Sequence, residues 1–237
     1  MGSRGEVRPG RVRGVIREDY LLGWIKRYLL WLAEIAGFIR TADYEAAARR
    51  ADLALRELLG LGPDSVLALT DGEILARLAM GDPPVVVRDK CLMVAALLYH
   101  LGHTAAGKGN ADLARDCWLK SLQVVLGTYF QGAGPLPEFA PQPEALIEAL
   151  RDAVLPARTE AALILFHEQH GQFDRAENAL FRLLERMGPE GEAGVIEMGL
   201  GFYRRLAVLS EESLAAGNFS REEVVAGRQE LERRRAS

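Results

Sequence analysis

The sequence predicts an all-α protein built from antiparallel helical hairpins that form an irregular solenoid or bundle. Apolar residues recur at three- and four-residue steps in almost every patterned segment, which is the period of a helix face. Glycine, proline and aspartate interrupt this period often enough to leave pairs of helices joined by short loops. The β-branched triplet from Val85 to Val87 has no partner run with which to form a sheet, so we assign it to the start of a helix.

The first hairpin is predicted between residues 20 and 60. Its first helix presents one broad apolar face, formed by Leu21, Trp24, Ile25, Tyr28, Leu29, Leu32, Ile35 and Ile39. A short loop at 40–43 leads into a second helix, in which Ala47, Ala51 and Ala54 are small enough to let the two helices approach closely. The two segments therefore read as one packed helix pair.

Later segments repeat this organisation. Further helices are predicted after Asp71 and at 88–106, 111–130, 144–154, 157–170, 174–187, 195–216 and 221–234. Ser220 precedes Glu223 by three residues and predicts a capping box at the start of the last helix. These elements divide the chain into a basic N-terminal tail at 1–17, a helical domain at 18–130, a proline-rich loop at 131–143 and further hairpins at 144–237. We expect the last section to pack on the first part as one continuous domain.

The charge balance argues against two classes of partner. The chain has 33 acidic and 29 basic residues and a formal net charge of -4, so no global field draws it to phosphate backbones. Its ends are basic, through five arginines at 1–17 and through Arg233 to Arg235, but short solvated tails have this composition. The longest uncharged run, Cys91 to Gly107, is shorter than the ~20 predominantly apolar residues of a membrane-spanning helix. We expect neither nucleic acid nor a membrane as partner.

Cysteine usage and the N-terminal pattern predict a cytoplasmic protein. Cys91 and Cys117 are the only cysteines, which is too few for a disulfide framework, and each lies in an apolar helical pattern. The first apolar stretch does not resemble a secretory leader, because Lys26, Arg27 and Glu34 interrupt it.

Three of the hairpins resemble tetratricopeptide repeats, in which small residues lie where two helices cross and aromatic residues fill the gap to the next hairpin. The matching positions are Leu98, Leu101, Gly102, Gly109, Ala114, Trp118 and Leu122 in the second hairpin, Trp31, Phe38, Tyr44, Ala47 and Ala54 in the first, and Leu163, His167, Gly171, Phe173, Ala176 and Leu184 in the third. Equivalent alanines lie about twice the ~34-residue repeat length apart, which predicts helices inserted between the hairpins. A generic helical bundle is the alternative.

A wider resemblance covers about residues 15–126. The segments Asp19–Leu22, Asp43–Ala47, Glu57–Leu61 and Leu67–Leu75 resemble an uncharacterised family of bacterial proteins with a tetratricopeptide-like core. The resemblance implies a bacterial cytosolic helical protein and assigns no functional residue. The C-terminal half departs from it through the proline-rich loop and the later hairpins.

The sharpest chemical feature is two histidine pairs, His100 with His103 and His167 with His170. The spacing in each pair places both rings toward one side of a helix. If the second and third hairpins abut, carboxylates such as those of Asp112, Asp116 and Glu168 could complete a zinc or iron site. The alternative is that these histidines are hydrogen-bonded packing residues.

The helix register also predicts a binding groove. In tetratricopeptide arrays the first helix of each hairpin lines the concave surface, and the positions that face it here are Leu29, Leu32, Tyr99, His103, Leu165, Glu168 and Gln169. These residues are mostly apolar or weakly polar, and the set lacks the cationic clamp that holds a peptide carboxylate. Such a surface would accept an apolar helix, an apolar extended segment or a second copy of the chain. The alternative is that inserted helices fill it.

The sequence therefore predicts a non-enzymatic, cytosolic interaction module with an apolar concave surface and no cofactor. No nucleophile–base arrangement can be argued from residue spacing. The first alternative is a metal-binding protein or metal-dependent enzyme that uses the two histidine pairs, and a further one is a sensor that holds a small apolar molecule.

Overall fold

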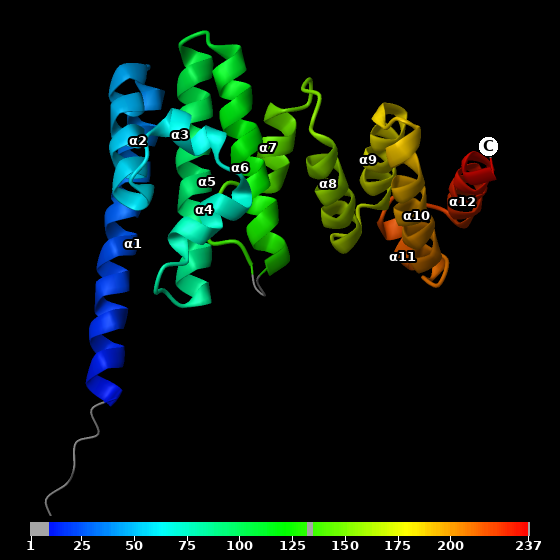
Figure 1. Cartoon of the computed structure of the whole chain (residues 1–237), viewed down its shortest axis with the longest axis horizontal. Coiled ribbons are helices and arrows are strands. Elements are labelled where there is room, and N and C mark those ends of the chain that lie inside the picture. Colours follow the sequence, from blue (N-terminus) through cyan, green and yellow to red (C-terminus); the bar gives the residue numbers. More distant parts are fainter. Residues whose placement is uncertain (1–9, 132–134, 237) are drawn as a thin grey trace, which may run out of the picture. The chain divides into compact units, whose positions relative to one another are not determined.

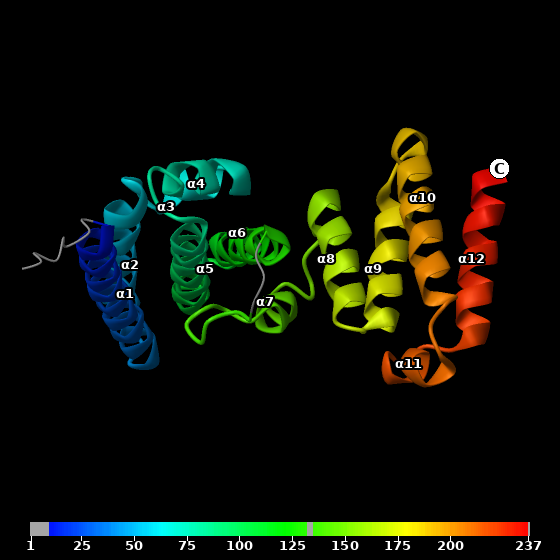
Figure 2. The same cartoon turned by 90° about the horizontal axis from the view of Figure 1, so that it is seen from below.

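The structure is a computed structural model that describes residues 10–131 and 135–236 (Figures 1 and 2). Its described residues form helices and no strands, so the all-α prediction is confirmed. The helices are α1 (Gly10–Arg40), α2 (Tyr44–Leu59), α3 (Pro63–Ala68), α4 (Asp71–Leu78), α5 (Pro84–Gly107), α6 (Ala111–Gln131), α7 (Pro143–Ala149), α8 (Ala157–Gln169), α9 (Phe173–Arg186), α10 (Pro189–Leu206), α11 (Glu211–Ala216) and α12 (Arg221–Ala236). The Val85–Val87 triplet lies in the first turn of α5, as predicted.

The helices form two compact units, Met1–Ala153 (unit 1) and Val154–Ser237 (unit 2). This division lies after α7, which packs against α6 and belongs to unit 1. The sequence-based division instead assigned residues 144–153 to the later hairpins. Each unit has its own apolar core and is described by itself below.

Helix α5 is the centre of unit 1. It contacts α1, α2, α4 and α6, and every residue from Leu92 to Leu98 is buried. Such an uninterrupted apolar run is expected for a helix surrounded by others. Hydrogen bonds join neighbouring helices inside the core: the Ser121 hydroxyl donates to the Ala95 carbonyl at 2.7 Å, and the Tyr28 hydroxyl donates to the Ala54 carbonyl at 3.4 Å.

Two glycines allow close packing in unit 1. A Cβ atom at Gly102 would overlap the Trp118 indole, so the absence of a side chain lets α6 lie close against α5. A Cβ at Gly107 would likewise overlap the Tyr44 ring, at the start of α2. The α5–α6 pair and the α1–α2 pair are thus fitted to each other through small residues facing large ones.

Unit 2 contains the pairs α8–α9 and α10–α12, with α9 also in contact with α10. Phe166, Leu180, Phe202 and Leu231 are buried in its core. Glu160 of α8 is only 3% exposed, and the Arg182 guanidinium of α9 lies 3.2 Å from its carboxylate. This contact compensates the charge of a buried acid and ties α8 to α9.

Several predicted boundaries are confirmed and others are wrong. The helix predicted after Asp71 is α4, and the capping box at Ser220 and Glu223 is present, with backbone-to-side-chain distances of 2.7 and 3.2 Å. The helix predicted at 195–216 is wrong, because α10 ends at Leu206 and the Ser210 hydroxyl caps the separate helix α11. The helix predicted at 144–154 is also shorter, since α7 ends at Ala149.

The two basic ends of the chain are helical as far as the structure describes them. Residues 10–17 form the beginning of α1, while residues 1–9 lie outside the described part. At the other end, Arg233 to Arg235 lie in α12, where each forms an ion pair with a glutamate of α10 or α12. The C-terminal arginines are therefore part of the folded unit.

Candidate functional site

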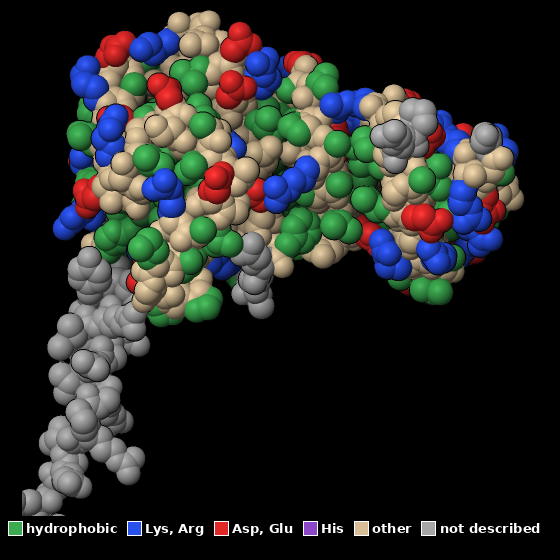
Figure 3. All heavy atoms as spheres, viewed as in Figure 1, with side chains coloured by type: hydrophobic (Ala, Val, Ile, Leu, Met, Phe, Trp, Pro, Cys, Tyr) green, Lys and Arg blue, Asp and Glu red, His purple; other side chains and the backbone are tan. Residues whose placement is uncertain are grey.

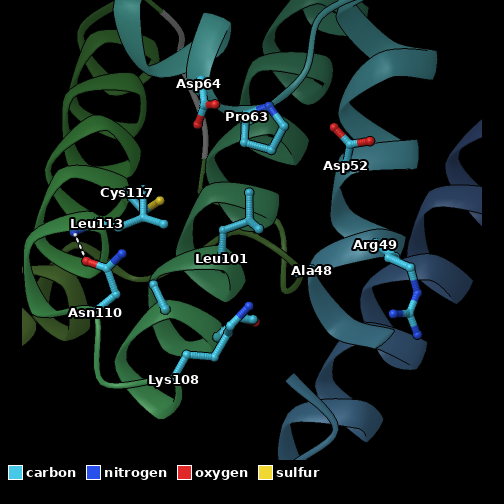
Figure 4. A pocket seen from close by; sticks show the side chains of 12 residues that line it. Ala48, Arg49, Asp52, Pro63, Asp64, Leu101, Lys108, Asn110, Leu113 and Cys117 are labelled. Atoms are coloured by element: carbon cyan, nitrogen blue, oxygen red, sulfur yellow. Dashed lines mark hydrogen bonds between the residues drawn. The ribbon is translucent and has the colours of Figure 1, made fainter. Parts of the chain in front are cut away.

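Unit 1 contains a pocket of about 420 Å³ between α2, α3, α5 and α6 (Figure 4). The residues that line it are Ala48, Arg49, Asp52, Pro63, Asp64, Leu101, Thr104, Ala105, Lys108, Asn110, Leu113 and Cys117. A pocket of this size, with an apolar floor and a few polar groups, is typical of a binding site.

Each wall of the pocket is one face of a helix. The lining residues Leu101 and Ala105 of α5 and Lys108, which caps that helix, follow one another at steps of four and three, so they share a face. Gly109 adopts a left-handed conformation, with φ 77°, in the turn that leads from α5 to α6. Asn110 then accepts a hydrogen bond from the Leu113 backbone N–H at 3.1 Å and starts α6. This tight connection holds the α5 and α6 walls in place.

The floor of the pocket is apolar and carries no activated nucleophile among the described residues. Leu101, Ala105 and Cys117 are buried. The Thr104 hydroxyl donates to the His100 carbonyl at 2.8 Å, so its only donor is already used within α5. Burial, with smaller effects of Asp116 and Asp64, raises the pKa of the Cys117 thiol to about 12. The thiol is therefore protonated at neutral pH and is a poor nucleophile.

The rim of the pocket is charged, and the charges are only partly paired. Lys108 Nζ lies 2.6 Å from Glu45 Oε1, and this pairing lowers the pKa of the Glu45 carboxyl. Asp52 pairs with Arg56 at 2.9 Å. Within the described residues, neither Arg49 nor Asp64 forms an ion pair, although Arg49 contributes to the field at Glu45.

The cationic and anionic residues lie at different places on the rim. In Figure 4, Asp64 lies beside Pro63 at one end of the pocket, whereas Lys108 lies at the other end and Arg49 projects from α2 on the side. Asp64 belongs to α3, one of the helices inserted between the first two hairpins. The inserted helix therefore supplies the anionic end of the pocket.

A second, smaller concavity lies on unit 2, with a volume of about 250 Å³. Charged side chains dominate it, and they pair with one another: Arg235 with Glu197 at 3.3 Å and Arg228 with Glu232 at 2.9 Å. Charged side chains of both signs are also interspersed on the unit surfaces seen in Figure 3. The pocket of unit 1 is the better candidate because it combines an apolar floor with incompletely paired rim charges.

The histidine rings of unit 1 pack against aromatic rings. The His103 ring meets the rings of Tyr99 and Trp118 edge to face, with centroid distances of 4.5 and 5.4 Å. Burial lowers the pKa of His100 to about 4, with a smaller effect of His103. Both rings are therefore parts of an aromatic cluster beside the α5–α6 crossing.

The histidine pair of unit 2 is engaged in hydrogen bonds at the end of α8. His167 Nδ1 lies 2.7 Å from Gln172 Oε1, and His170 Nδ1 lies 2.8 Å from the Phe166 carbonyl, to which it donates. These contacts fix the last turn of the helix.

The carboxylates named for the metal alternative also have partners. Glu168 pairs with Arg205 at 2.5 Å, and Asp112 and Asp116 share Arg115 at 3.0 and 3.7 Å. In the part of the chain that the structure describes, no three His, Cys, Asp or Glu side chains cluster in a way that could hold a metal ion.

The predicted groove residues fall in both units. In unit 1, Leu32 is 7% exposed and lies in the core, while Leu29 is 40% exposed and Tyr99 and His103 are half-buried. In unit 2, Leu165 and Gln169 are exposed, and the side chain of Glu168 is 15% exposed and ion-paired. None of the seven lines the pocket of unit 1.

The pocket residues themselves were not predicted as a site. Leu101 and Cys117 belong to the two helices of the second hairpin, as the sequence predicts. Leu101, Ala105 and Lys108 are spaced by four and three residues, and this spacing was a usable signal of the site. A lysine at the end of an apolar helix face marks the point at which that face meets solvent. No spacing pattern in the sequence indicated that Pro63 and Asp64 would line the pocket.

A protein-family model described as a family of unknown function, DUF6483, matches residues 15–236. The chain belongs to this family. The prediction of an uncharacterised family is thereby confirmed, but its extent was too short, since the DUF6483 match continues through the proline-rich loop and the later hairpins. All residues that line the pocket lie within the DUF6483 match.

No curated protein and no solved structure matches the chain. Among the described residues, no helix is both long and apolar enough to cross a membrane.

Proposed function

We propose that the chain is a non-enzymatic protein-interaction module that holds an apolar segment of a partner protein in the pocket of unit 1. The observation that carries this proposal is the combination of an apolar floor, made by Leu101, Ala105 and Cys117, with an open, charged rim. Apolar anchor side chains that enter such pockets supply most of the affinity of a protein interface.

The chemistry of the pocket favours binding over catalysis. Among the described lining residues, the polar groups of Thr104 and Asn110 already hydrogen-bond within the fold, and the Cys117 thiol is held protonated. Catalysis by a nucleophile requires an activated group beside a base, and these groups do not offer one. An apolar floor needs no such group in order to bind a side chain.

We further propose that the hairpins are tetratricopeptide-like. This is supported by Gly102 facing Trp118 where α5 and α6 cross, and by the buried alanines Ala47 and Ala54 of α2. The inserted helices α3, α4 and α7 account for the irregular spacing of the hairpins. The proposed site uses one of these insertions as a wall, in place of the predicted concave surface. A cytoplasmic location agrees with two free, buried cysteines.

The proposal is tested by selecting a phage-displayed library of random peptides against the immobilised full chain. We expect peptides with a large apolar residue to be enriched. Their binding should fall by about tenfold or more in Ala48→Trp, because the indole would occupy the pocket and displace an anchor worth about 1.5–3 kcal/mol.

Leu53→Trp is the matched control. Leu53 lies on the same helix, is 56% exposed and does not line the pocket. A tryptophan at this position should therefore leave peptide binding unchanged. Thermal unfolding of both variants verifies that they are folded. If no peptide is enriched, or if the enriched peptides bind Ala48→Trp as well as the wild-type chain, the proposed function is wrong.

A further inference from the structure

Figure 4 shows that the charged residues of the pocket are segregated, and this segregation identifies the class of segment that fits. The inference rests on the proposed function and specifies the partner. An apolar floor fixes which side chain enters but not the direction in which its chain runs. Charges on the rim supply that direction.

Two cations, Lys108 and Arg49, lie away from Asp64 on the rim of the pocket. Lys108 and Arg49 both act on Glu45, which forms an ion pair with Lys108 and whose pKa both cations lower. Asp43, a second acid beside these cations, acts on the Glu45 pKa in the opposite direction. The Arg49 guanidinium, which forms no ion pair within the described residues, remains able to pair with an acidic group that arrives from outside.

The opposite end of the pocket carries Asp64. Asp64 and Asp116 both act on the Cys117 thiol and raise its pKa, which places their fields at the same part of the floor. Asp116 pairs with Arg115 at 3.7 Å, whereas Asp64 has no ion pair in the described part. A basic group that arrives at this end would find an anionic partner.

We propose that the pocket binds a peptide segment whose apolar anchor lies between a basic residue, on the Asp64 side, and an acidic residue, on the Arg49–Lys108 side. The anchor is buried against Leu101 and Ala105, and the two flanking charges meet rim charges of opposite sign. A segment with two acidic or two basic flanks would meet a like charge at one end of the pocket.

Three synthetic versions of the best-enriched peptide test the proposal, with the anchor kept and the flanking residues set to lysine and glutamate, to two lysines or to two glutamates. The wild-type chain should bind the mixed version about fivefold more tightly than either of the others. This preference should shrink at high salt, because the rim charges are exposed to solvent.

Charge reversal in the protein should then change the preference in a defined way. Asp64→Lys should favour the version with two glutamates, and Arg49→Glu the version with two lysines. The double variant, Asp64→Lys with Arg49→Glu, reverses the charge at both places on the rim. It should again favour the version with one lysine and one glutamate, with the peptide chain running through the pocket in the opposite direction. Glu144→Lys, an exposed residue of α7 that does not line the pocket, is the control and should keep the wild-type order.

The outcomes separate this inference from the proposed function. If the three versions bind the wild-type chain equally, and still lose binding in Ala48→Trp, the pocket binds peptides but the charge rule is wrong. An unchanged order of preference in both Asp64→Lys and Arg49→Glu would also overturn the charge rule. If the peptides bind Ala48→Trp normally, the proposed function itself fails.

Discussion

His100 is held in its uncharged form by its surroundings. Burial is the main cause of its lowered pKa, and the neighbouring His103 adds a smaller effect in the same direction. A histidine in water takes up a proton near pH 6.5, whereas His100 in the folded chain does so only near pH 4. Between these values the unfolded chain binds more protons than the folded chain.

Acid should therefore weaken the fold through this residue. The stabilising contribution is complete above pH 6.5 and is lost as the pH falls toward 4, by about 3 kcal/mol at most. Urea denaturation of the wild-type chain and of His100→Gln, measured at pH values across this window, checks the prediction. Because glutamine cannot be protonated, the variant should lose less stability on acidification. Equal slopes for the two proteins would show that His100 is not responsible.

At the scale of single residues, the histidine pairs could be identified from the sequence, but the groups that their rings contact could not. Spacing on a helix places His100 and His103 on one side, and this much follows from the sequence. Whether a ring meets Trp118 or a metal ion depends on which neighbouring helix lies opposite. The edge-to-face contacts of His103 are set by the α5–α6 crossing, which the spacing of the histidines does not contain.

At the scale of the elements, the α5–α6 pair depends on a missing side chain. Trp118 packs against the backbone of α5 at Gly102, and its indole N–H has no hydrogen-bond partner within the described residues. Packing alone therefore holds the ring in place. A methyl group at Gly102 would have to push the two helices apart or turn the indole out of its position.

Gly102→Ala should accordingly destabilise the protein by about 1–3 kcal/mol, in spite of the higher helix propensity of alanine. The control is Gly23→Ala in α1, where a Cβ would meet nothing within 4 Å and the change should be neutral or slightly stabilising. Denaturant titrations of both variants provide the measurement. If the two variants differ by less than the experimental error, the close crossing is not structurally important.

Most elements could be predicted because they follow from periodicity and caps. The hairpin helices, the helix after Asp71 and the capping box at Ser220 belong to this group. The break between α10 and α11 was missed because apolar positions continue through it, while the Ser210 cap is a single local signal. The pocket was missed because its existence depends on where α3 lies against α5 and α6. Short inserted helices such as α3 carry little pattern from which that position could be derived.

At the scale of the whole molecule, the chain consists of two compact units with separate cores. The division falls between Ala153 and Val154. The predicted groove was assembled from residues of both units, with Leu29 and Tyr99 in the first and Leu165 and Gln169 in the second. Assigning groove residues from a repeat pattern assumes that each hairpin is placed on the next by the same rotation and translation. Sequence periodicity does not test this assumption. The pocket proposed as the site depends on unit 1 alone.

Unit 2 should be able to fold by itself. Its large buried side chains, among them Phe166, Phe202 and Tyr203, contact neighbours within residues 154–237. A fragment of these residues should be helical by far-ultraviolet circular dichroism and should unfold cooperatively on heating, as expected for a domain of this size. A fragment without a cooperative transition would show that its core is incomplete without residues 1–153.

Helix α5 lies among α1, α2, α4 and α6 but is synthesised after three of them. When α1 through α4 have been synthesised, the faces of α1, α2 and α4 that contact α5 in the finished fold still lack that partner. Until α5 follows, these faces are exposed apolar surface, which makes an incompletely folded chain prone to aggregation. Synthesis of α5 supplies the missing partner, so the core of unit 1 can form only once the chain has been extended through Gly107.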